Sequence, residues 1–112
     1  MSDCIFCKII AGDIPSKKVY EDELIYAFND IAPKADVHVL VIPKQHIARL
    51  DQAKASDAKL LSHLLLSLPK IALLKGLETG FRTILNTGPG GGQEVDHLHF
   101  HILGGKNLPG FQ

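Results

Sequence analysis

The chain contains, at residues 96–103, the stretch Asp-His-Leu-His-Phe-His-Ile-Leu, with a histidine at every second position. Successive side chains of an extended strand point to opposite faces, so His97, His99 and His101 would share one face of such a strand. Neighbouring imidazoles would lie roughly 6 to 7 Å apart, close enough to bind one phosphate-sized group. Because imidazole changes its charge near neutral pH, the pattern indicates nucleophilic or proton-transfer chemistry more than a solvated strand face.

The sequence on either side of this stretch predicts the strands and helices that surround it. Short β-rich runs are bounded by turn residues, and two apolar patterns have helical spacing. Most connections between successive strands are too short for a parallel crossover. We therefore predict an α+β fold in which one long and one short helix accompany an antiparallel sheet of about five strands. The predicted helices are residues 4–11 and 56–76, and the predicted strands are 19–21, 24–30, 37–42, 81–85 and 95–103.

The size and charge of the chain limit its class. With 112 residues, of which 46% are hydrophobic, it fits a single domain spanning residues 1–112. Lys and Arg together number 12, as do Asp and Glu, so no overall basic field attracts nucleic acid or an anionic membrane. The N-terminus lacks a basic segment followed by an apolar run, and we expect a cytoplasmic protein that binds neither nucleic acid nor membrane.

Residues 86–94 form a glycine-rich loop that leads directly into the histidine stretch. Glycine permits close approach of the backbone, so amides around residues 90–94 could bind an anion that faces the imidazoles. The loop is not a P-loop, because it connects two predicted strands and lacks a Gly-Lys-Ser/Thr ending. A flexible turn is the alternative interpretation.

The two cysteines, Cys4 and Cys7, stand three residues apart. This spacing suits a metal or redox pair better than a disulfide joining distant parts of a fold. With two histidines the pair could form a tetrahedral zinc site, and two reduced, partly buried thiols are the alternative.

Together these motifs resemble those of the histidine triad (HIT) family, and in particular its Hint branch. The resemblance extends over nearly the whole chain, through residues 4–10, 12–15, 27–31, 41–44 and 86–105. It implies an enzyme that hydrolyses purine nucleoside 5′-phosphoramidates, which are conjugates of AMP or GMP with an amine, and that requires no cofactor. It also implies a homodimer in which two sheets join into about ten strands.

The resemblance gives each histidine a role. His99 would attack the α-phosphate and form a nucleotidyl-histidine intermediate that water then hydrolyses. Its other ring nitrogen needs an acceptor, which the backbone carbonyl near the first histidine or a neighbouring imidazole would supply. His38 and His97 would form the supporting network. His101 would stabilise developing charge on the phosphate, together with Asn86, Gly92, Gln93, Glu94 and Val95.

The resemblance also implies residues that bind the nucleoside. Asp30 corresponds to the position that accepts hydrogen bonds from the ribose hydroxyls, whereas the sequence alone favours a turn-capping aspartate. The resemblance also places several apolar residues in a slot that binds the base, although without the resemblance these residues would be interpreted as ordinary core. These positions, with the neighbouring Asn29, are Ile5, Phe6, Ile9, Phe28, Ile31 and Leu40.

Two further expectations concern Glu94 and a metal. Where better-known Hint proteins have a serine, this chain has Glu94, and because a carboxylate repels phosphate we expect its side chain to turn away. Its main chain alone would then contact the phosphate. Some HIT proteins with the cysteine pair bind zinc through two histidines that correspond to His46 and His97. Such zinc would be structural, and it would draw His97 away from His38.

Other functions stay open at this point. The nearest is hydrolysis of dinucleoside polyphosphates or of other nucleotidyl compounds. A second is a nucleotide-sensing or partner-binding module whose hydrolysis is incidental, and a third is a zinc-stabilised structural domain.

Overall fold

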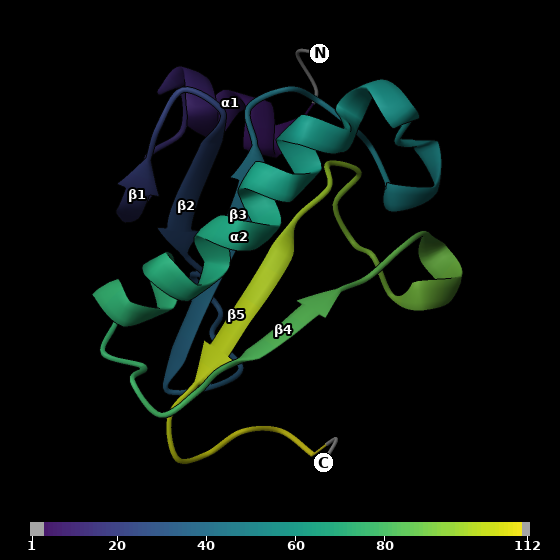
Figure 1. The fold of residues 1–112 in the computed structure, drawn as a ribbon. Helices are drawn as coiled ribbons and strands as arrows, with labels where there is room; N and C mark the ends of the chain where they lie inside the picture. The colour runs from purple at the N-terminus through teal and green to yellow at the C-terminus, as the bar shows by residue number, and fades with distance from the viewer. Residues whose placement is uncertain (1–3, 111–112) are drawn as a thin grey trace.

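The computed structural model describes residues 4–110 and has the predicted α+β architecture (Figure 1). Within these residues five strands form one antiparallel sheet in the order β1-β2-β3-β5-β4, accompanied by one short and one long α-helix. The prediction of the fold class is therefore confirmed. The elements are α1 (Ile5–Ala11), β1 (Lys18–Glu21), β2 (Ile25–Asn29), β3 (Val37–Pro43), α2 (Ala58–Leu74), β4 (Arg82–Leu85) and β5 (Phe100–Gly104).

The two helices pack on opposite faces of the sheet. In the central strand β3, Val39 and Val41 belong to the core that α2 covers, whereas Leu40 and Ile42 belong to a second core with Phe6 of α1. Figure 1 shows α2 running diagonally across its face of the sheet. Because α1 has only seven residues, it covers only part of the other face. That uncovered area is where a ligand can reach the sheet.

The histidine stretch enters the sheet later than predicted. Strand β5 begins at Phe100 rather than at residue 95, so the first two histidines precede the hydrogen-bonded ladder. The N–H of His97 donates to the carbonyl of Val95 at 2.9 Å in a tight turn. The N–H of Leu98 donates to the carbonyl of Ile47 at 2.7 Å. These local and loop contacts take the place of ladder bonds.

The predicted alternation of side chains nevertheless holds before the ladder begins. Leu98 and Ile102 pack in the core beneath α2. The rings of His97 and His99 lie on the opposite side, where both contact Phe6. An extended backbone is therefore enough to separate the imidazoles from the apolar residues.

Helix α2 is shorter than the predicted 56–76, because Ala55–Asp57 form a 3₁₀ turn before it. At its other end Gly76 has φ +79°, and its N–H bonds to the carbonyl of Leu73 at 3.0 Å. Glycine adopts this left-handed conformation without strain, so it ends the helix as predicted. Nowhere in residues 4–110 is a helix both long and apolar enough to cross a membrane.

The turn between β1 and β2 is joined to α2 by Asp22. One of its carboxylate oxygens accepts the N–H groups of Leu24 and Ile25 at 2.8 and 2.9 Å. The other accepts bonds from the Tyr20 hydroxyl at 3.0 Å and from Nε2 of His63 at 2.7 Å. Burial raises the pKa of Asp22, but these hydrogen bonds outweigh it and lower the pKa to about 2.

Candidate active site

On the α1 side of the sheet, beyond α1, lies a cavity of about 380 Å³. A cavity of this size is large enough for a small-molecule ligand. Strands β3, β4 and β5 form its floor, and in the sheet register His101 stands opposite Leu40 on one side and Ile84 on the other. The glycine-rich loop contributes to its wall. The lining residues are Asp30, Lys34, His38, Ile84, Asn86, Gly92, Glu94, His99, His101, Leu103 and Pro109.

His99 is fixed in one tautomer by the backbone. Its Nδ1 lies 2.7 Å from the carbonyl oxygen of His97, which is one of the two kinds of acceptor that the resemblance implied. A carbonyl oxygen only accepts, so Nδ1 carries a proton, and the uncharged form of the ring has its lone pair on Nε2. The residue is 6% exposed, and the ring of Phe6 packs edge-on against it with centroids 5.2 Å apart. His99 therefore offers an oriented ring whose Nε2 can act as a nucleophile.

A second backbone group fixes His38 and, through it, His101. The N–H of Lys34 donates to Nδ1 of His38 at 3.0 Å, so His38 carries its proton on Nε2. That Nε2 lies 2.9 Å from Nδ1 of His101, which must accept. The proton of His101 is consequently on its own Nε2. This ring can donate a hydrogen bond into the cavity.

Burial keeps both of these rings neutral. It lowers the pKa of His101 to about 4, with a smaller contribution from His99 and His38. Burial also lowers the pKa of His38, against the opposite influence of the Asp30 carboxylate 3.5 Å away. At neutral pH His38 and His101 therefore present hydrogen-bonding groups rather than imidazolium charge.

The two histidines expected to form the supporting network act separately: His38 bonds to His101, and His97 supports His99 through its carbonyl. The expected proximity of His97 to His38 is wrong, because His38 bonds to His101 instead. The ring of His97 turns away from the cavity, and its Nε2 donates to the carbonyl of Pro43 at 2.8 Å. Burial is the main cause that lowers the pKa of His97 to about 4. His97 reaches His99 only through its backbone.

The glycine-rich loop is held by its own hydrogen bonds. The N–H groups of Gly92 and Gln93 donate to carbonyls within the loop at 3.1 and 3.0 Å, so these two amides are not free for an anion. The Gln93 side chain accepts from the N–H of Gly88 and donates to the carbonyls of Ala48 and Val95, all at 2.8 Å. The expectation that Gln93 binds phosphate is therefore corrected: Gln93 holds the loop in place.

The amides of Glu94 and Val95 form no backbone hydrogen bond within residues 4–110. Glu94 lines the cavity, so its amide is placed to meet an anion there, whereas Val95 is not among the lining residues. Glu94 is exposed. The direction of its carboxylate stays a prediction.

The expected nucleoside-binding residues are only partly at the cavity. Asp30 lines it, as does Asn86 from the expected phosphate-binding set. One oxygen of Asp30 accepts the N–H of Ala32 at 2.8 Å, so the turn-capping interpretation also applies. The other expected residues do not line the cavity. Phe6, Ile9, Phe28 and Leu40 are buried in the core beneath α1, Asn29 ends β2, and Ile5 and Ile31 are exposed.

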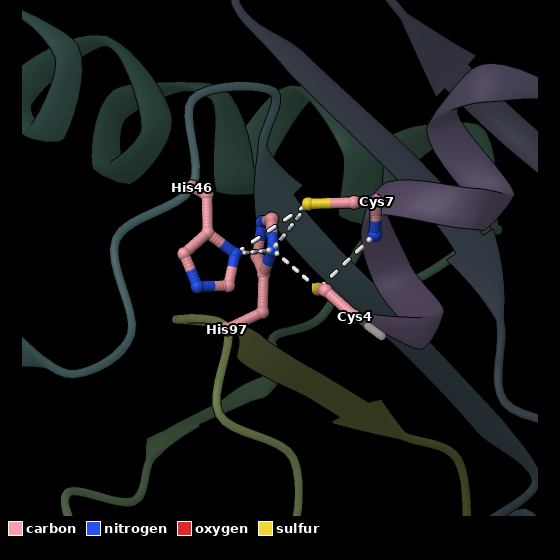
Figure 2. A group of neighbouring side chains, drawn as sticks. All are labelled: Cys4, Cys7, His46 and His97. Atoms are coloured by element: carbon pink, nitrogen blue, oxygen red, sulfur yellow. Dashed lines mark hydrogen bonds between the residues drawn. The ribbon is translucent and has the colours of Figure 1, made fainter. Parts of the chain in front are cut away.

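A second cluster lies on the other side of His97. Figure 2 shows Cys4 and Cys7 at α1, His46 on the loop after β3, and His97, with all four side chains directed toward one another. The two Nδ1 atoms of His46 and His97 are 3.1 Å apart. Nδ1 of His97 lies 3.3 Å from Sγ of Cys4 and 3.6 Å from Sγ of Cys7, and Nδ1 of His46 lies 3.4 Å from Sγ of Cys7.

These separations suit a tetrahedral zinc ion. With Zn–N of about 2.0 to 2.1 Å and Zn–S of about 2.3 Å, tetrahedral ligands lie about 3.3 to 3.8 Å apart. The rings of His46 and His97 converge, since their centroids are 4.9 Å apart and their nitrogens only 3.1 Å. Because Nε2 of His97 donates to Pro43, its Nδ1 is unprotonated, as a metal ligand must be. The four residues therefore fit zinc.

Comparison with known proteins identifies the family of this chain. The family model described as HIT domain matches residues 11–108. The chain belongs to the HIT family. A HIT-like protein of Synechococcus elongatus, itself uncharacterised, is 58% identical over 106 residues, which cover 95% of this chain and 93% of that protein.

Solved structures agree with the fold of this HIT protein. A HIT family hydrolase from Legionella pneumophila has a TM-score of 0.91 at 46% identity, and 96% of each chain is covered. A histidine triad nucleotide-binding protein from Candida albicans has a TM-score of 0.82 at 36% identity, over 98% of this chain and 85% of that one.

Four cavity residues of this HIT protein were missed in the sequence. Leu103 lies two positions after His101 on the same strand and shares its face, so the alternation that identified the histidines could have found it. Ile84 stands opposite His101 on β4, which needs the register of the sheet. Lys34 and Pro109 come from loops, where no periodic signal exists.

Proposed function

We propose that this HIT protein hydrolyses the P–N bond of purine nucleoside 5′-phosphoramidates through a nucleotidyl intermediate on His99. The observation that carries the proposal is the pair of fixed tautomers, which leaves a lone pair on Nε2 of His99 and a proton on Nε2 of His101. Their ring centroids are 5.1 Å apart. A nucleophile and a hydrogen-bond donor can thus contact the same phosphate.

In the first step Nε2 of His99 attacks the α-phosphorus, the P–N bond breaks, and the amine leaves with a proton from solvent water. His99 then carries a positive charge, which is stabilised by the His97 carbonyl that accepts its Nδ1–H. In the second step water attacks phosphorus, the bond to His99 breaks, and the nucleoside monophosphate departs while the proton from water passes to solvent. Two displacements with a good leaving group replace one difficult displacement.

The remaining contacts follow from position and chemistry. His101, Asn86 and the free amide of Glu94 bind the phosphate oxygens. Asp30 has a carboxylate that can accept hydrogen bonds from the ribose hydroxyls. The solved relatives described as a hydrolase and as a nucleotide-binding protein support this class of reaction and ligand.

The test is to trap the intermediate. Protein mixed with adenosine 5′-phosphoramidate and quenched in alkali should carry one AMP group, which peptide mass spectrometry should locate on His99. His99→Ala should abolish turnover and keep nucleotide affinity. His63→Ala is the matched control with normal turnover, because His63 lies on α2 and does not line the cavity. Full activity of His99→Ala, or an adduct elsewhere, would refute the assignment.

The same assay and a complementation test separate the alternatives. Faster turnover of diadenosine polyphosphates than of phosphoramidates would favour hydrolysis of dinucleoside polyphosphates, with a nucleotide as leaving group. His99→Ala should keep its affinity for AMP under either function, so complementation decides: the variant would restore a strain that lacks the protein if the function is nucleotide sensing, and would fail to do so if hydrolysis is needed.

Zinc is proposed as a structural ion of this protein. Bound by Cys4, Cys7, His46 and His97, it would join α1 to the loop after β3 and to the histidine stretch, and so stabilise the fold. Metal analysis of untagged protein should find one zinc per chain. A double variant Cys4→Ser, Cys7→Ser with unchanged metal content and stability would exclude this role.

A second copy of the chain is the proposed partner. Within residues 4–110, strand β4 lies at the edge of the sheet and pairs with β5 alone. Helix α2 exposes 75% of Leu66 and 61% of Leu73. Self-association would pair the edge and cover apolar surface. Sedimentation velocity should give a dimer, and a monomer at every concentration would contradict the proposal.

A further inference from the structure

His97 belongs to both clusters of the protein. Its imidazole Nδ1 faces the metal cluster, and its backbone carbonyl accepts the hydrogen bond that sets the tautomer of His99. We propose that the cluster of Cys4, Cys7, His46 and His97 positions the nucleophile, because zinc bound there immobilises His97 and thereby holds His99 in its Nδ1–H form. The inference rests on the proposed role of His99, and it makes His97 a positioning residue.

The other polar atoms of His97 are already hydrogen-bonded, so its ring atom Nδ1 is left to bind the metal cluster. The residue has 0% exposure. Its Nε2–H bonds to Pro43 and its backbone N–H bonds to Val95, at 2.8 and 2.9 Å. Nδ1 therefore carries no proton, and it faces the Nδ1 of His46 and two sulfur atoms. Without a metal, Nδ1 of His97 can accept from Nδ1–H of His46 at 3.1 Å or from a thiol, which is a weak donor. A metal ion binds this lone pair together with those of His46 and the two sulfur atoms, and so fixes all four side chains at once.

The segment that carries His46 is tied directly to the segment that carries His97. The N–H of Leu98 donates to the carbonyl of Ile47 at 2.7 Å, one residue beyond each histidine. The Gln93 amide bridges the carbonyls of Ala48 and Val95. A displacement of the His46 ring is therefore transmitted to the backbone of the histidine stretch over a short path.

Helix α1 provides a second connection. It carries Cys7 with Cys4 at its N-cap, and it also carries Phe6, whose ring contacts both His97 and His99 with centroid distances of 5.9 and 5.2 Å. A metal ion that pins α1 through its cysteines also fixes the ring that packs against the nucleophile. Both connections end at His99: the backbone of His97 contacts its Nδ1, and Phe6 packs against its ring.

The test observes the tautomer of His99 directly. Protein with ¹⁵N-labelled histidine rings is compared at one alkaline pH in three forms: loaded with zinc, stripped by a chelator, and loaded with cadmium. The zinc form should show His99 protonated on Nδ1 alone. Chelation should populate the second tautomer. Cadmium, whose longer bonds displace His97 without unfolding the chain, should shift the Nδ1 resonance of His99.

Two variants complete the test. His46→Ala removes one ligand and touches neither the His97 carbonyl nor the cavity, so it should reproduce the spectrum of the stripped protein. It should also lower kcat about fivefold at unchanged KM, because the nucleophile loses orientation while substrate contacts remain. His63→Ala is the control for loss of a structural histidine, and it should leave the His99 resonances unchanged.

Identical His99 resonances in the zinc, cadmium and His46→Ala forms would overturn the coupling, and so would a protein that takes up no zinc. If removal of zinc unfolds the chain, the comparison of zinc with cadmium decides. These readouts do not need turnover. A His99 tautomer that follows the metal in a protein forming no AMP adduct would therefore refute the proposed function and not the coupling.

Discussion

Gln93 holds the glycine-rich loop in place through three side-chain hydrogen bonds of 2.8 Å each. The substitution Gln93→Ala removes all three. A hydrogen bond contributes about 0.5 to 1.5 kcal/mol net to stability, and because Gln93 is half-buried, water replaces part of what is lost. We expect the free energy of unfolding to fall by about 2 kcal/mol, near the lower end of that sum.

Urea unfolding followed by circular dichroism measures this loss. With a slope of about 2 kcal/mol/M, the midpoint should fall by about 1 M. Gln45→Ala is the matched control, because this exposed glutamine makes one side-chain bond, to Asp57 at 3.1 Å, and should change stability by less than about 0.5 kcal/mol. Gln93→Glu should destabilise at least as much as Gln93→Ala, since a carboxylate would face two carbonyl oxygens. Equal midpoints for Gln93→Ala and Gln45→Ala would refute the reasoning.

Three other changes have defined outcomes. His38→Ala should lower kcat about tenfold, which is equivalent to about 1.4 kcal/mol, because His101 loses the donor that sets its tautomer. Steady-state kinetics measures this effect, and an unchanged kcat would contradict it. Asp22 has a folded pKa below its unfolded value, so its stabilisation is complete above pH about 4 and is lost as pH falls toward about 2. Between about pH 4 and pH 2 the free energy of unfolding of the wild type should therefore fall by about 1 to 2 kcal/mol more than that of Asp22→Asn, after allowance for screening by solvent. Equal loss of stability in both proteins on acidification would count against this. Glu94→Ser should lower KM about twofold at low salt, because it removes an exposed negative charge near the phosphate of the substrate. High salt screens this charge, so the effect should vanish there. An effect on KM that does not depend on salt would require another cause.

The parts of the fold that depend on neighbouring residues could be predicted well. Alternation in residues 98–103 separates imidazoles from core side chains, whether or not the segment is in the ladder. Gly76 ends α2 because its left-handed backbone is a local property. The start of β5 could not be predicted, because Leu98 bonds to Ile47, about fifty residues earlier in the chain. The same reason explains the error over Gln93, whose partner Ala48 lies on a distant loop.

The sequence by itself determined that three imidazoles share one side of an extended segment and that Cys4 and Cys7 stand one helical turn apart, because backbone geometry between near neighbours decides both. Only the tertiary structure decided what each imidazole does. The tautomer of His38 is set by the amide of Lys34, and that of His97 by the carbonyl of Pro43. The ring of His97 meets His46 only once the sheet and α1 are packed together. Tautomers and ring directions follow the nearest donor or acceptor in space, and in a folded chain that group often belongs to a residue far away in sequence.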